Sequence, residues 1–344
     1  MLRTTDDVLR WAGRLVDPPL RTAIGRLPEP SREVAELQLG WHHLTWGGVD
    51  APAVSVRSAL TLVCADAVGG DPHDAVPSAV AVELMHHWSA IRRDLVDEHA
   101  DGTAWGVVGA EPASLGGEAL LALAFDVIAT GDPTRSSPAR IRQRSGQASP
   151  DRAMLRVLGD TVQELLHGQH ASLALRDTRP GATPAGEERT DLLRDTLAMV
   201  EQRTGALFGC ACALGAAAGG GDPAQVERLR LFGVRLGLAV QFTEDLAGIG
   251  PDLRRRRRSL PVAAAIAAGA DELAALFEGR TRLSDADLER AAKTIEQSGA
   301  REWCRRQADE LLSQALLTLD LASPSPAAVA ELVALARRAT ATAR

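Results

Sequence analysis

The sequence contains no tyrosine and a single lysine, Lys293, among its 344 residues, and aromatic residues make up only 3% of it. The scarcity of lysine is typical of a GC-rich coding bias, so an arginine in the place of a lysine counts as a retained cation. The formal net charge is -7, and the chain has no long basic or acidic tail. This balance argues against general nucleic-acid binding.

Long apolar runs and strand signals are also missing. No run of about 18 or more consecutive apolar residues occurs, so we expect no membrane span. The opening residues, Met-Leu-Arg-Thr-Thr-Asp-Asp, lack the apolar core of a signal peptide, and we expect a cytoplasmic protein. Alternation of β-branched residues between turns is nearly absent, whereas helical periodicity continues along almost the whole chain.

The few cysteines do not form a metal-binding pattern. Cys210 and Cys212 lie in an apolar helical run and are separated by one residue, whereas zinc pairs usually have about two to four intervening residues. Together with Cys64 and Cys304, they are expected to be buried, reduced thiols.

The periodicity predicts an all-α protein, and an apolar content of 45% is enough for a large core. Two Asp-Pro pairs, at Asp71 and Asp222, each place a capping carboxylate before a proline at the start of a helix. The predicted helices are Arg32–Trp41, Ser55–Val68, Ala75–Glu98, Gly116–Ala129, Asp151–Arg176, Asp191–Ala218, Pro223–Gly248, Ser259–Ala268, Asp271–Glu278, Asp285–Ser298, Ala300–Leu319 and Ser325–Ala339.

Two long polar segments, Thr130–Pro150 and Asp177–Glu188, interrupt the helical pattern. Because composition and periodicity do not change after them, we interpret them as mobile surface loops of a single domain, 1–344, and not as domain boundaries. The segments Gly116–Ala129 and Leu207–Ala218 are apolar on most helical faces. Such helices belong at the centre of a large bundle.

Polar residues recur at particular points of this apolar pattern, and their order along the chain is informative. The segments concerned are Arg57–Pro72, Ala81–Asp97, Gly116–Ala124, Gln202–Leu207, Gly237–Asp245 and Arg257–Val262. In this order they resemble segments of the trans-polyprenyl diphosphate synthases of the geranylgeranyl type, from about Arg57 to Arg337. The resemblance implies an all-α isoprenoid-synthase bundle with a central apolar cavity, usually as a homodimer.

The resemblance also implies a reaction. An allylic diphosphate ionises to a carbocation, which is attacked by the double bond of a homoallylic diphosphate. The leaving pyrophosphate requires concentrated positive charge, usually Mg²⁺ between two carboxylate clusters. The cavity beyond it must be apolar and dry, because water quenches the cation.

The substrate-binding positions of the family carry over to this sequence with few changes. Arg57 and His86 occupy positions that hold the homoallylic diphosphate, and Arg203 and Thr204 occupy a Lys-Thr pair that holds the allylic one. Gln241 matches a glutamine near the reacting centre.

The metal-binding positions carry over less completely. Asp94 and Asp97 remain from the first aspartate-rich motif, at a spacing that places both carboxylates on one helical face. Arg93 occupies the position of the first aspartate of that motif. Glu244 and Asp245 match the opening pair of the second motif. We take Arg93, Asp94, Asp97 and Gln241 as catalytic candidates, and Asp97, Glu244 and Asp245 as ligands of Mg²⁺.

Other departures from the family pattern surround the same two phosphate sites. Val54 stands where the family has a lysine, and the arginine pair expected after Asp97 is missing. The segment Gly168–Ser172 lacks the aspartate of a Gly-Gln-x-x-Asp motif, and a lysine-bearing Thr-Gly-Lys loop is missing after Asp245. The apolar scaffold, by contrast, is intact, which indicates a folded protein in use.

Arg93 has the largest expected consequence, because a guanidinium close to Mg²⁺ is repelled by several kcal/mol at low effective dielectric. We hypothesise that Arg93 pairs with Asp97 or Glu244, or that it contacts the diphosphate directly as a bidentate donor.

Trp88 lies on the same helix, more than one turn before Arg93. In the family, a large side chain at this position closes the end of the product tunnel. The resemblance therefore implies products of roughly C15–C20. Simple core packing is the alternative interpretation of Trp88.

Three further features have simpler explanations than a metal or nucleic-acid site. His86 and the adjacent His87 point to different helical faces and do not chelate together. The pair His167 and His170 is expected to be solvated or to line a cavity. The run Arg254–Arg258 matches a basic family segment near the diphosphate site, and we interpret it as a local anion-facing or solvated run.

Three functions fit these observations. The first is a prenyl diphosphate synthase that elongates an allylic diphosphate with isopentenyl diphosphate through an altered metal site. The second is a class I terpene cyclase, which needs only one diphosphate substrate. The third is a weakly active or inactive subunit that pairs with an active synthase. A prenyl diphosphate ligand and a homodimer or heterodimer are expected partners.

Overall fold

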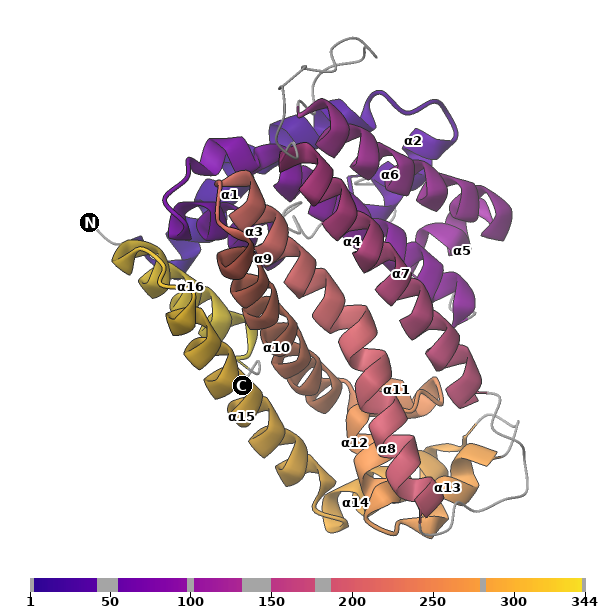
Figure 1. Ribbon diagram of the computed structural model, residues 1–344. Coiled ribbons are helices and arrows are strands. Elements are labelled where there is room, and N and C mark those ends of the chain that lie inside the picture. Colours follow the sequence, from indigo (N-terminus) through magenta and orange to yellow (C-terminus); the bar gives the residue numbers. More distant parts are fainter. Residues whose placement is uncertain are drawn as a thin grey trace. The chain divides into compact units, whose positions relative to one another are not determined.

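Helices make up all the regular structure in the residues that the structure describes, which are 3–41, 55–97, 102–131, 150–176, 187–278 and 283–341 (Figure 1). The structure is a computed structural model. No strand occurs within these ranges, and the all-α prediction is confirmed. The segments 132–149 and 177–186, which include most of the two predicted loops, lie outside the described residues, as does Val54.

The helices group into two compact units. The first unit comprises Met1–Gln163, Leu207–Gly233 and Leu317–Leu335, and the second comprises Glu164–Ala206, Val234–Leu316 and Ala336–Arg344. Several helices contribute residues to both units. A single domain over the whole chain therefore remains a prediction, as does the central cavity.

The helix bounds agree with the predicted ones to within a few residues for most elements. The elements are α1 (Thr5–Ile24), α2 (Ser31–Gln38), α3 (Val56–Ala67), the 3-10 turn η1 (Pro72–Ala75), α4 (Val76–Val96), α5 (Ala104–Val108), α6 (Ala110–Thr130), α7 (Pro150–Arg176), α8 (Glu187–Val200), the π-helical turn η2 (Glu201–Gly205), α9 (Ala206–Ala218), α10 (Pro223–Ala247), α11 (Ile249–Arg254), α12 (Leu260–Ala267), α13 (Asp271–Glu278), α14 (Asp285–Gln297), α15 (Ala300–Leu321) and α16 (Pro326–Ala339).

Helix α1 is absent from the predicted helices, because Pro18 and Pro19 interrupt the pattern that the sequence offers. A capping box stabilises its start: the side chains of Thr4 and Asp7 each accept a hydrogen bond from the other's backbone N–H. Its buried residues recur about every four positions, from Val8 onward. Packing of these side chains against other helices therefore stabilises α1 in spite of the two prolines.

The two predicted Asp-Pro helix starts are confirmed. The Asp71 carboxylate accepts a hydrogen bond from the His73 N–H at 2.9 Å. The Asp222 carboxylate accepts from the backbone N–H groups of Ala224 and Gln225 at 2.8 and 2.9 Å. Each aspartate thus satisfies donors that the first helical turn leaves without partners.

In the first unit, α6 packs along α4 and also contacts α2 (Figure 1). By length and composition alone α6 is apolar enough to cross a membrane, with a mean hydropathy of 1.5 over its most apolar window. The core helix of a globular protein meets the same criterion, and the inner face of α6 is buried from Ala113 to Ile128. We therefore interpret α6 as the central helix that its sequence predicts.

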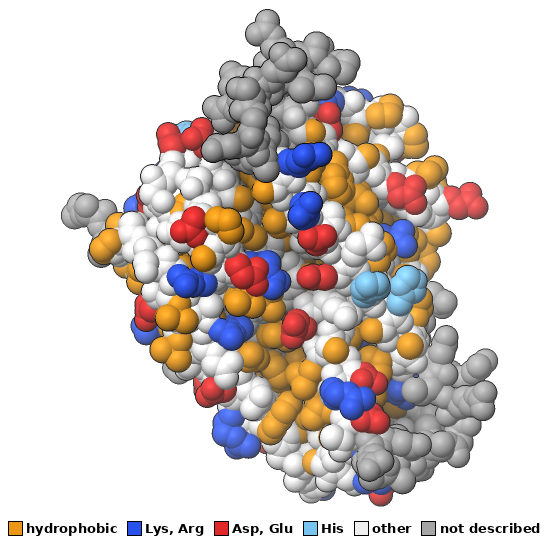
Figure 2. Space-filling view, viewed as in Figure 1, with side chains coloured by type: hydrophobic (Ala, Val, Ile, Leu, Met, Phe, Trp, Pro, Cys, Tyr) orange, Lys and Arg blue, Asp and Glu red, His pale blue; other side chains and the backbone are white. Residues whose placement is uncertain are grey.

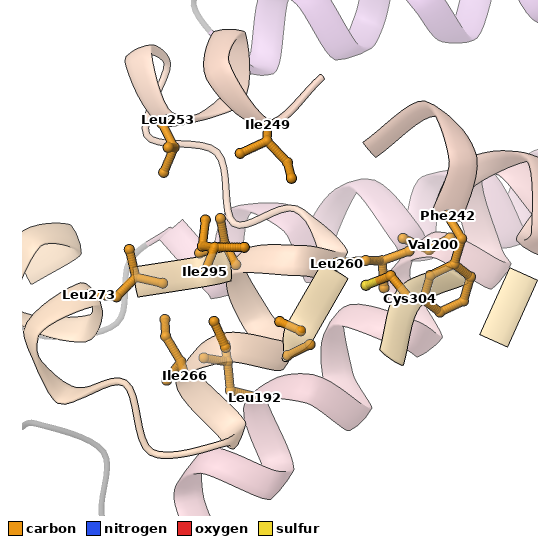
Figure 3. Close-up of a cluster of buried hydrophobic side chains, with 14 of the residues drawn as sticks. Leu192, Val200, Phe242, Ile249, Leu253, Leu260, Ile266, Leu273, Ile295 and Cys304 are labelled. Atoms are coloured by element: carbon orange, nitrogen blue, oxygen red, sulfur yellow. The ribbon is translucent and has the colours of Figure 1, made fainter. Parts of the chain in front are cut away.

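The core of the second unit is built from α8 and from α10 to α15 (Figure 3). Phe242 of α10 meets the ring of Trp303 edge-on, with ring centroids 5.8 Å apart. Leu260, Val262 and Ile266 place the apolar face of the short helix α12 in this cluster. The core fixes the part of α10 that carries Gln241, Glu244 and Asp245.

All four cysteines are buried and form no disulfide, which confirms the prediction of buried thiols. Cys212 of α9 is hydrogen-bonded to Cys64 of α3, and this bond together with burial raises the pKa of the Cys212 thiol well above its usual range. Both cysteines therefore act as small apolar residues in the core of the first unit.

Surface charges are interspersed on the face drawn in Figure 2, where basic, acidic and apolar side chains alternate over short distances. Several arginines pair with an acid one turn away on their own helix, as Arg194 does with Asp191 and Arg230 with Glu227, both at 2.8 Å. Such ion pairs at the surface contribute little stability.

Candidate active site

The residues that sequence similarity singles out fall into two groups, one in each unit. The first unit holds the group on α3 and α4, which consists of Arg57, His86, Trp88, Arg93, Asp94 and Asp97. The second unit holds the group on η2 and α10, which consists of Arg203, Thr204, Gln241, Glu244 and Asp245.

Arg57 lies in the first turn of α3. Ser55 caps this helix, and its Oγ accepts a hydrogen bond from the Arg57 N–H at 3.2 Å. The Arg57 guanidinium lies over the ring of Phe208, 4.7 Å from its centroid. The cap and the cation–π contact together restrict where the guanidinium can lie.

A buried acid, Glu83, lies on α4 one turn before His86 and His87, and no role was expected for it. Its carboxylate is 1% exposed, and its Oε1 accepts hydrogen bonds from the Ser55 N–H at 2.8 Å, from the Ser55 hydroxyl at 2.7 Å and from the Ser58 hydroxyl. One sequence signal was available: Glu83 is the single charged residue in an apolar stretch of α4. A charge in such a stretch must find partners when the helix is buried.

His86 and His87 lie one turn further along α4, with ring centroids 5.2 Å apart. The Nδ1 atom of each ring is buried and has no hydrogen-bond partner in the described structure. Burial lowers the pKa of His86 well below its usual value, and the nearby positive charge of Arg57 adds to this effect. Burial also lowers the pKa of His87. Both rings are therefore neutral at pH 7.

Trp88 is 2% exposed and faces α6. Its Cδ1 lies 3.7 Å from where a Cβ would stand on Gly117, so α6 passes close to the indole because Gly117 has no side chain. Core packing of Trp88 is therefore observed, and its role in setting product length remains a prediction.

Arg93 contacts its sequence neighbour. Its Nε lies 3.4 Å from Oδ1 of Asp94, and the two side chains are 43% and 16% exposed. Asp97 caps the C-terminus of α4, where its N–H donates to the Arg93 carbonyl at 2.8 Å. This contact with Asp94 differs from the pairings with Asp97 or Glu244 that we hypothesised, which remain predictions.

In the second unit, a chain of hydrogen bonds joins η2, α10 and α12. The Thr204 hydroxyl donates to Oε1 of Gln241 at 2.6 Å, and Nε2 of Gln241 donates to Asp245 at 2.7 Å. The other carboxylate oxygen of Asp245 accepts from the Leu260 N–H at 2.9 Å. Both ends of the Gln241 amide are thus engaged, which fixes its orientation relative to Thr204.

The turn that carries Arg203 and Thr204 is π-helical, although the sequence predicts one continuous helix over Asp191–Ala218. An inserted π turn shifts the side chains that follow it and is frequent at functional sites. Here it brings Thr204 to Gln241, while Gly205 approaches Val234 of α10. The periodicity of the sequence carries no signal for this insertion, because its residues continue the helical pattern on both sides.

Gly168 of α7 allows the close approach of Arg203. A Cβ on Gly168 would lie 2.7 Å from Cγ of Arg203 and 3.0 Å from Cβ of Gln202. We expect Gly168→Ala to displace Arg203 and to weaken the binding of an allylic diphosphate about tenfold, with a loss of about 1–3 kcal/mol in stability. Isothermal titration with geranyl diphosphate measures the first effect.

Gly159→Ala, on the same helix, is the matched control. No atom lies within 4 Å of the added Cβ there, and alanine favours a helix by roughly 0.5–1 kcal/mol over glycine. Equal affinities for the Gly159→Ala and Gly168→Ala variants would show that Arg203 is not displaced.

Glu244 and Asp245 are adjacent but differ in environment. Glu244 is exposed, whereas Asp245 is 3% exposed and engaged by Gln241 and Leu260. Within the described residues, no group of three or more His, Cys, Asp or Glu side chains is arranged to hold a metal ion. Mg²⁺ is, however, commonly bound by one or two carboxylates together with substrate phosphates. The carboxylates of Asp97 in the first unit and of Glu244 in the second are each oxygen donors of the kind that Mg²⁺ prefers.

Asp252 of α11 is a second acid that sequence reasoning missed. It is 4% exposed and lies 3.6 Å from the guanidinium of Arg257. Burial raises the pKa of Asp252 to about 6; the charge of Arg257 opposes this shift, and the charge of Asp245 adds to it. Nothing in the segment Gly248–Asp252 signals burial of this aspartate.

The raised pKa predicts how Asp252 affects stability. The folded state holds the proton of Asp252 up to about pH 6, whereas the unfolded chain releases it near 3.8. Stability therefore falls as pH rises from about 4 to 6. We expect Asp252→Asn, which mimics the protonated acid, to remove this pH dependence of the free energy of unfolding. Urea unfolding of both proteins between pH 4 and 8 measures it, and a pH-independent difference between them would contradict the assignment.

The arginine run is largely built into the second unit. Arg256 donates to the Leu276 carbonyl and Arg258 to the Leu175 carbonyl, both at 2.6 Å, and Arg257 faces Asp252. Arg254 and Arg255 are exposed, as expected for a solvated run. His167 and His170 are likewise exposed, which agrees with the interpretation of a solvated pair. The start of the segment that follows Asp97 lies outside the described residues.

Known proteins resemble this chain along most of its length. The family model for polyprenyl synthetase matches residues 48–295. The (2E,6E)-farnesyl diphosphate synthase of Mycobacterium tuberculosis is 33% identical over 339 residues, which cover 92% of this chain and 87% of that protein. The geranylgeranyl diphosphate synthase of the same organism is 33% identical over 344 residues, covering 93% and 90%.

The fold is similar as well. The crystal structure of a polyprenyl synthetase from Streptomyces coelicolor A3(2) has a TM-score of 0.82 and 30% sequence identity, and the match covers 97% of this chain and 99% of that one. The resemblance of the separate motifs thus extends over more than nine-tenths of the chain and to its three-dimensional structure. The chain therefore belongs to the polyprenyl synthetase family, with the isoprenoid-synthase fold, and is an enzyme of the prenyltransferase type.

Proposed function

We propose that the chain is a short-chain trans-prenyl diphosphate synthase, which elongates an allylic diphosphate with isopentenyl diphosphate. The similarity over more than nine-tenths of the chain to relatives named farnesyl and geranylgeranyl diphosphate synthases carries this proposal. We further propose that it acts in the cytoplasm, as a dimer of two copies or with a related synthase.

The residues in each unit support the binding of one diphosphate. In the first unit, Arg57 supplies a fixed positive charge beside the two neutral rings of His86 and His87. In the second, Arg203 supplies the charge, and Thr204 is held in place by Gln241. An arginine presents several donors in a rigid fork that suits phosphate oxygens. We assign Arg57 and His86 to isopentenyl diphosphate, and Arg203 and Thr204 to the allylic substrate.

The proposed binding of Mg²⁺ depends on a small number of carboxylates. The proposed ligands of Mg²⁺ are Asp97 of the first unit and Glu244 and Asp245 of the second, which would bind it together with the substrate diphosphate. When bound, Mg²⁺ supplies the positive charge that stabilises the leaving pyrophosphate. Arg93, which contacts Asp94, supplies part of this positive charge by donating hydrogen bonds directly to the diphosphate.

The same contact supports a second candidate function. Arg93 partly neutralises Asp94, and the Asp245 carboxylate is already engaged by Gln241 and Leu260. A subunit that binds prenyl diphosphates but contributes little chemistry would keep such a site. It would act beside an active synthase.

A product analysis distinguishes these functions. The purified protein is incubated with Mg²⁺ and C10, C15 or C20 allylic diphosphates, with and without isopentenyl diphosphate. Longer diphosphates that require isopentenyl diphosphate support elongation. Hydrocarbons or alcohols formed without it would indicate a terpene cyclase. An absence of turnover, with co-purification of an active synthase, would indicate the subunit.

The position of Trp88 predicts a limit on product length of roughly C15–C20. We expect Trp88→Ala to yield longer products, because it removes a large buried side chain between α4 and α6. Mass spectrometry of the products measures the change. Trp11→Ala, which removes an indole from α1 in the same unit, is the control. Identical product lengths for Trp88→Ala and the unmodified protein would rule out this role.

A further inference from the structure

Glu83 has no role in the reaction described above, although it lies one helical turn from His86 and His87 on α4. We propose that Glu83 is a positioning residue that fixes the first turn of α3 and thereby places Arg57 for isopentenyl diphosphate. This inference rests on the proposed function, since it assigns a task within the same binding site.

The burial of Glu83 requires an explanation. A carboxylate that is 1% exposed has lost almost all of its hydration, which is costly unless hydrogen bonds replace the lost water. At Glu83, Oε1 receives three hydrogen bonds, and all of them come from Ser55 and Ser58 at the start of α3. A negative charge at the N-terminus of a helix is also favoured by the helix dipole. The carboxylate therefore ties α3 to α4 at this point.

Arg57 lies inside the turn that Glu83 holds. The Ser55 hydroxyl donates to Glu83 and accepts from the Arg57 N–H at 3.2 Å, so one hydroxyl links the carboxylate to the arginine backbone. The Thr61 hydroxyl donates to the Arg57 carbonyl at 3.0 Å one turn later. Once this backbone is fixed, the guanidinium is set by its contact with Phe208. Loss of the Glu83 charge frees the turn and moves Arg57.

Glu83→Gln tests this role, because it keeps the side-chain volume and removes the charge that strengthens the hydrogen bonds. We expect the KM for isopentenyl diphosphate to rise roughly tenfold, while kcat and the KM for the allylic substrate change less than about threefold. Ser58→Ala should act in the same direction. Its effect should not add to that of Glu83→Gln, because both variants break one network.

Glu331→Gln is the matched control for loss of a buried carboxylate. Glu331 is 5% exposed and binds Arg3 through both oxygens, at 2.8 and 2.7 Å, also in the first unit. The Glu331→Gln variant should have a lower melting temperature and unchanged KM values for both substrates. The proposal is overturned if Glu83→Gln raises both KM values equally, or if it only lowers the melting temperature as Glu331→Gln does.

A binding measurement separates this proposal from the proposed function. If the unmodified protein shows no turnover, isothermal titration with isopentenyl diphosphate replaces the assay. Binding by the unmodified protein that is lost in Glu83→Gln supports the positioning role even though elongation fails. Equal binding by both proteins, or binding by neither, overturns it.

Discussion

Replacing Gly215 with alanine is expected to destabilise the protein by about 3 kcal/mol or more and to lower its melting temperature by roughly 5 °C or more. A Cβ on Gly215 would lie 2.0 Å from the Thr61 carbonyl oxygen and 2.8 Å from its carbonyl carbon. These are backbone atoms of α3, which cannot rotate away as the tip of a side chain can. Helices α9 and α3 must therefore separate, and the cores on both sides of the contact open.

Thermal unfolding followed by circular dichroism at 222 nm measures this effect. Gly13→Ala on α1 is the control, because no atom lies within 4 Å of the added Cβ. The control should be unchanged or stabilised by up to about 1 kcal/mol, since alanine favours a helix. Equal melting temperatures for the Gly215→Ala and Gly13→Ala variants would mean that α3 and α9 do not pack as closely as described.

The second large effect concerns Asp97. We expect Asp97→Asn to lower kcat for prenyl transfer by about a hundredfold or more, because it removes a full negative charge from the site proposed for Mg²⁺. The fold should be unaffected, since asparagine has nearly the same size and the Asp97 N–H still donates to the Arg93 carbonyl. A loss of activity without a change in melting temperature would therefore report on the chemistry.

The dependence on Mg²⁺ gives this experiment a second readout. If Asp97 binds the metal, the Mg²⁺ concentration for half-maximal activity should rise in the Asp97→Asn variant. Glu111→Gln, an exposed acid in the first turn of α6, should change neither value. Unaltered turnover and unaltered Mg²⁺ dependence in Asp97→Asn would show that Asp97 does not bind the metal.

The helices of this protein could be predicted well because they depend on short-range information. Apolar periodicity, capping aspartates before proline and the scarcity of strand signals act within a few residues, and the helix bounds followed them. The short helices α5 and α11 were not predicted, and neither was α1, where Pro18 and Pro19 oppose a helix locally and buried residues such as Val8 restore it. That balance depends on contacts with other helices, which local pattern does not contain.

In the candidate site, too, the residues could be predicted from the sequence but their contacts could not. Arg57, Gln241 and Asp97 could be named because each belongs to a segment whose order along the chain resembles the family. The partners of these residues could not be named. Glu83 meets Ser55 across about 28 positions of sequence, and the contact of Thr204 with Gln241 spans 37. Such contacts follow from how helices pack.

The sequence by itself determined the helical class and the family, and it supplied the candidate diphosphate-binding residues, because these depend on residue type, spacing and order. Only the tertiary structure decided which polar groups are buried and what engages them. It buried Glu83 under α3, inserted the π turn before Thr204, engaged Asp245 with Gln241 and raised the pKa of Asp252 to about 6. Burial sets the cost of a charge, and burial is a property of the packed chain.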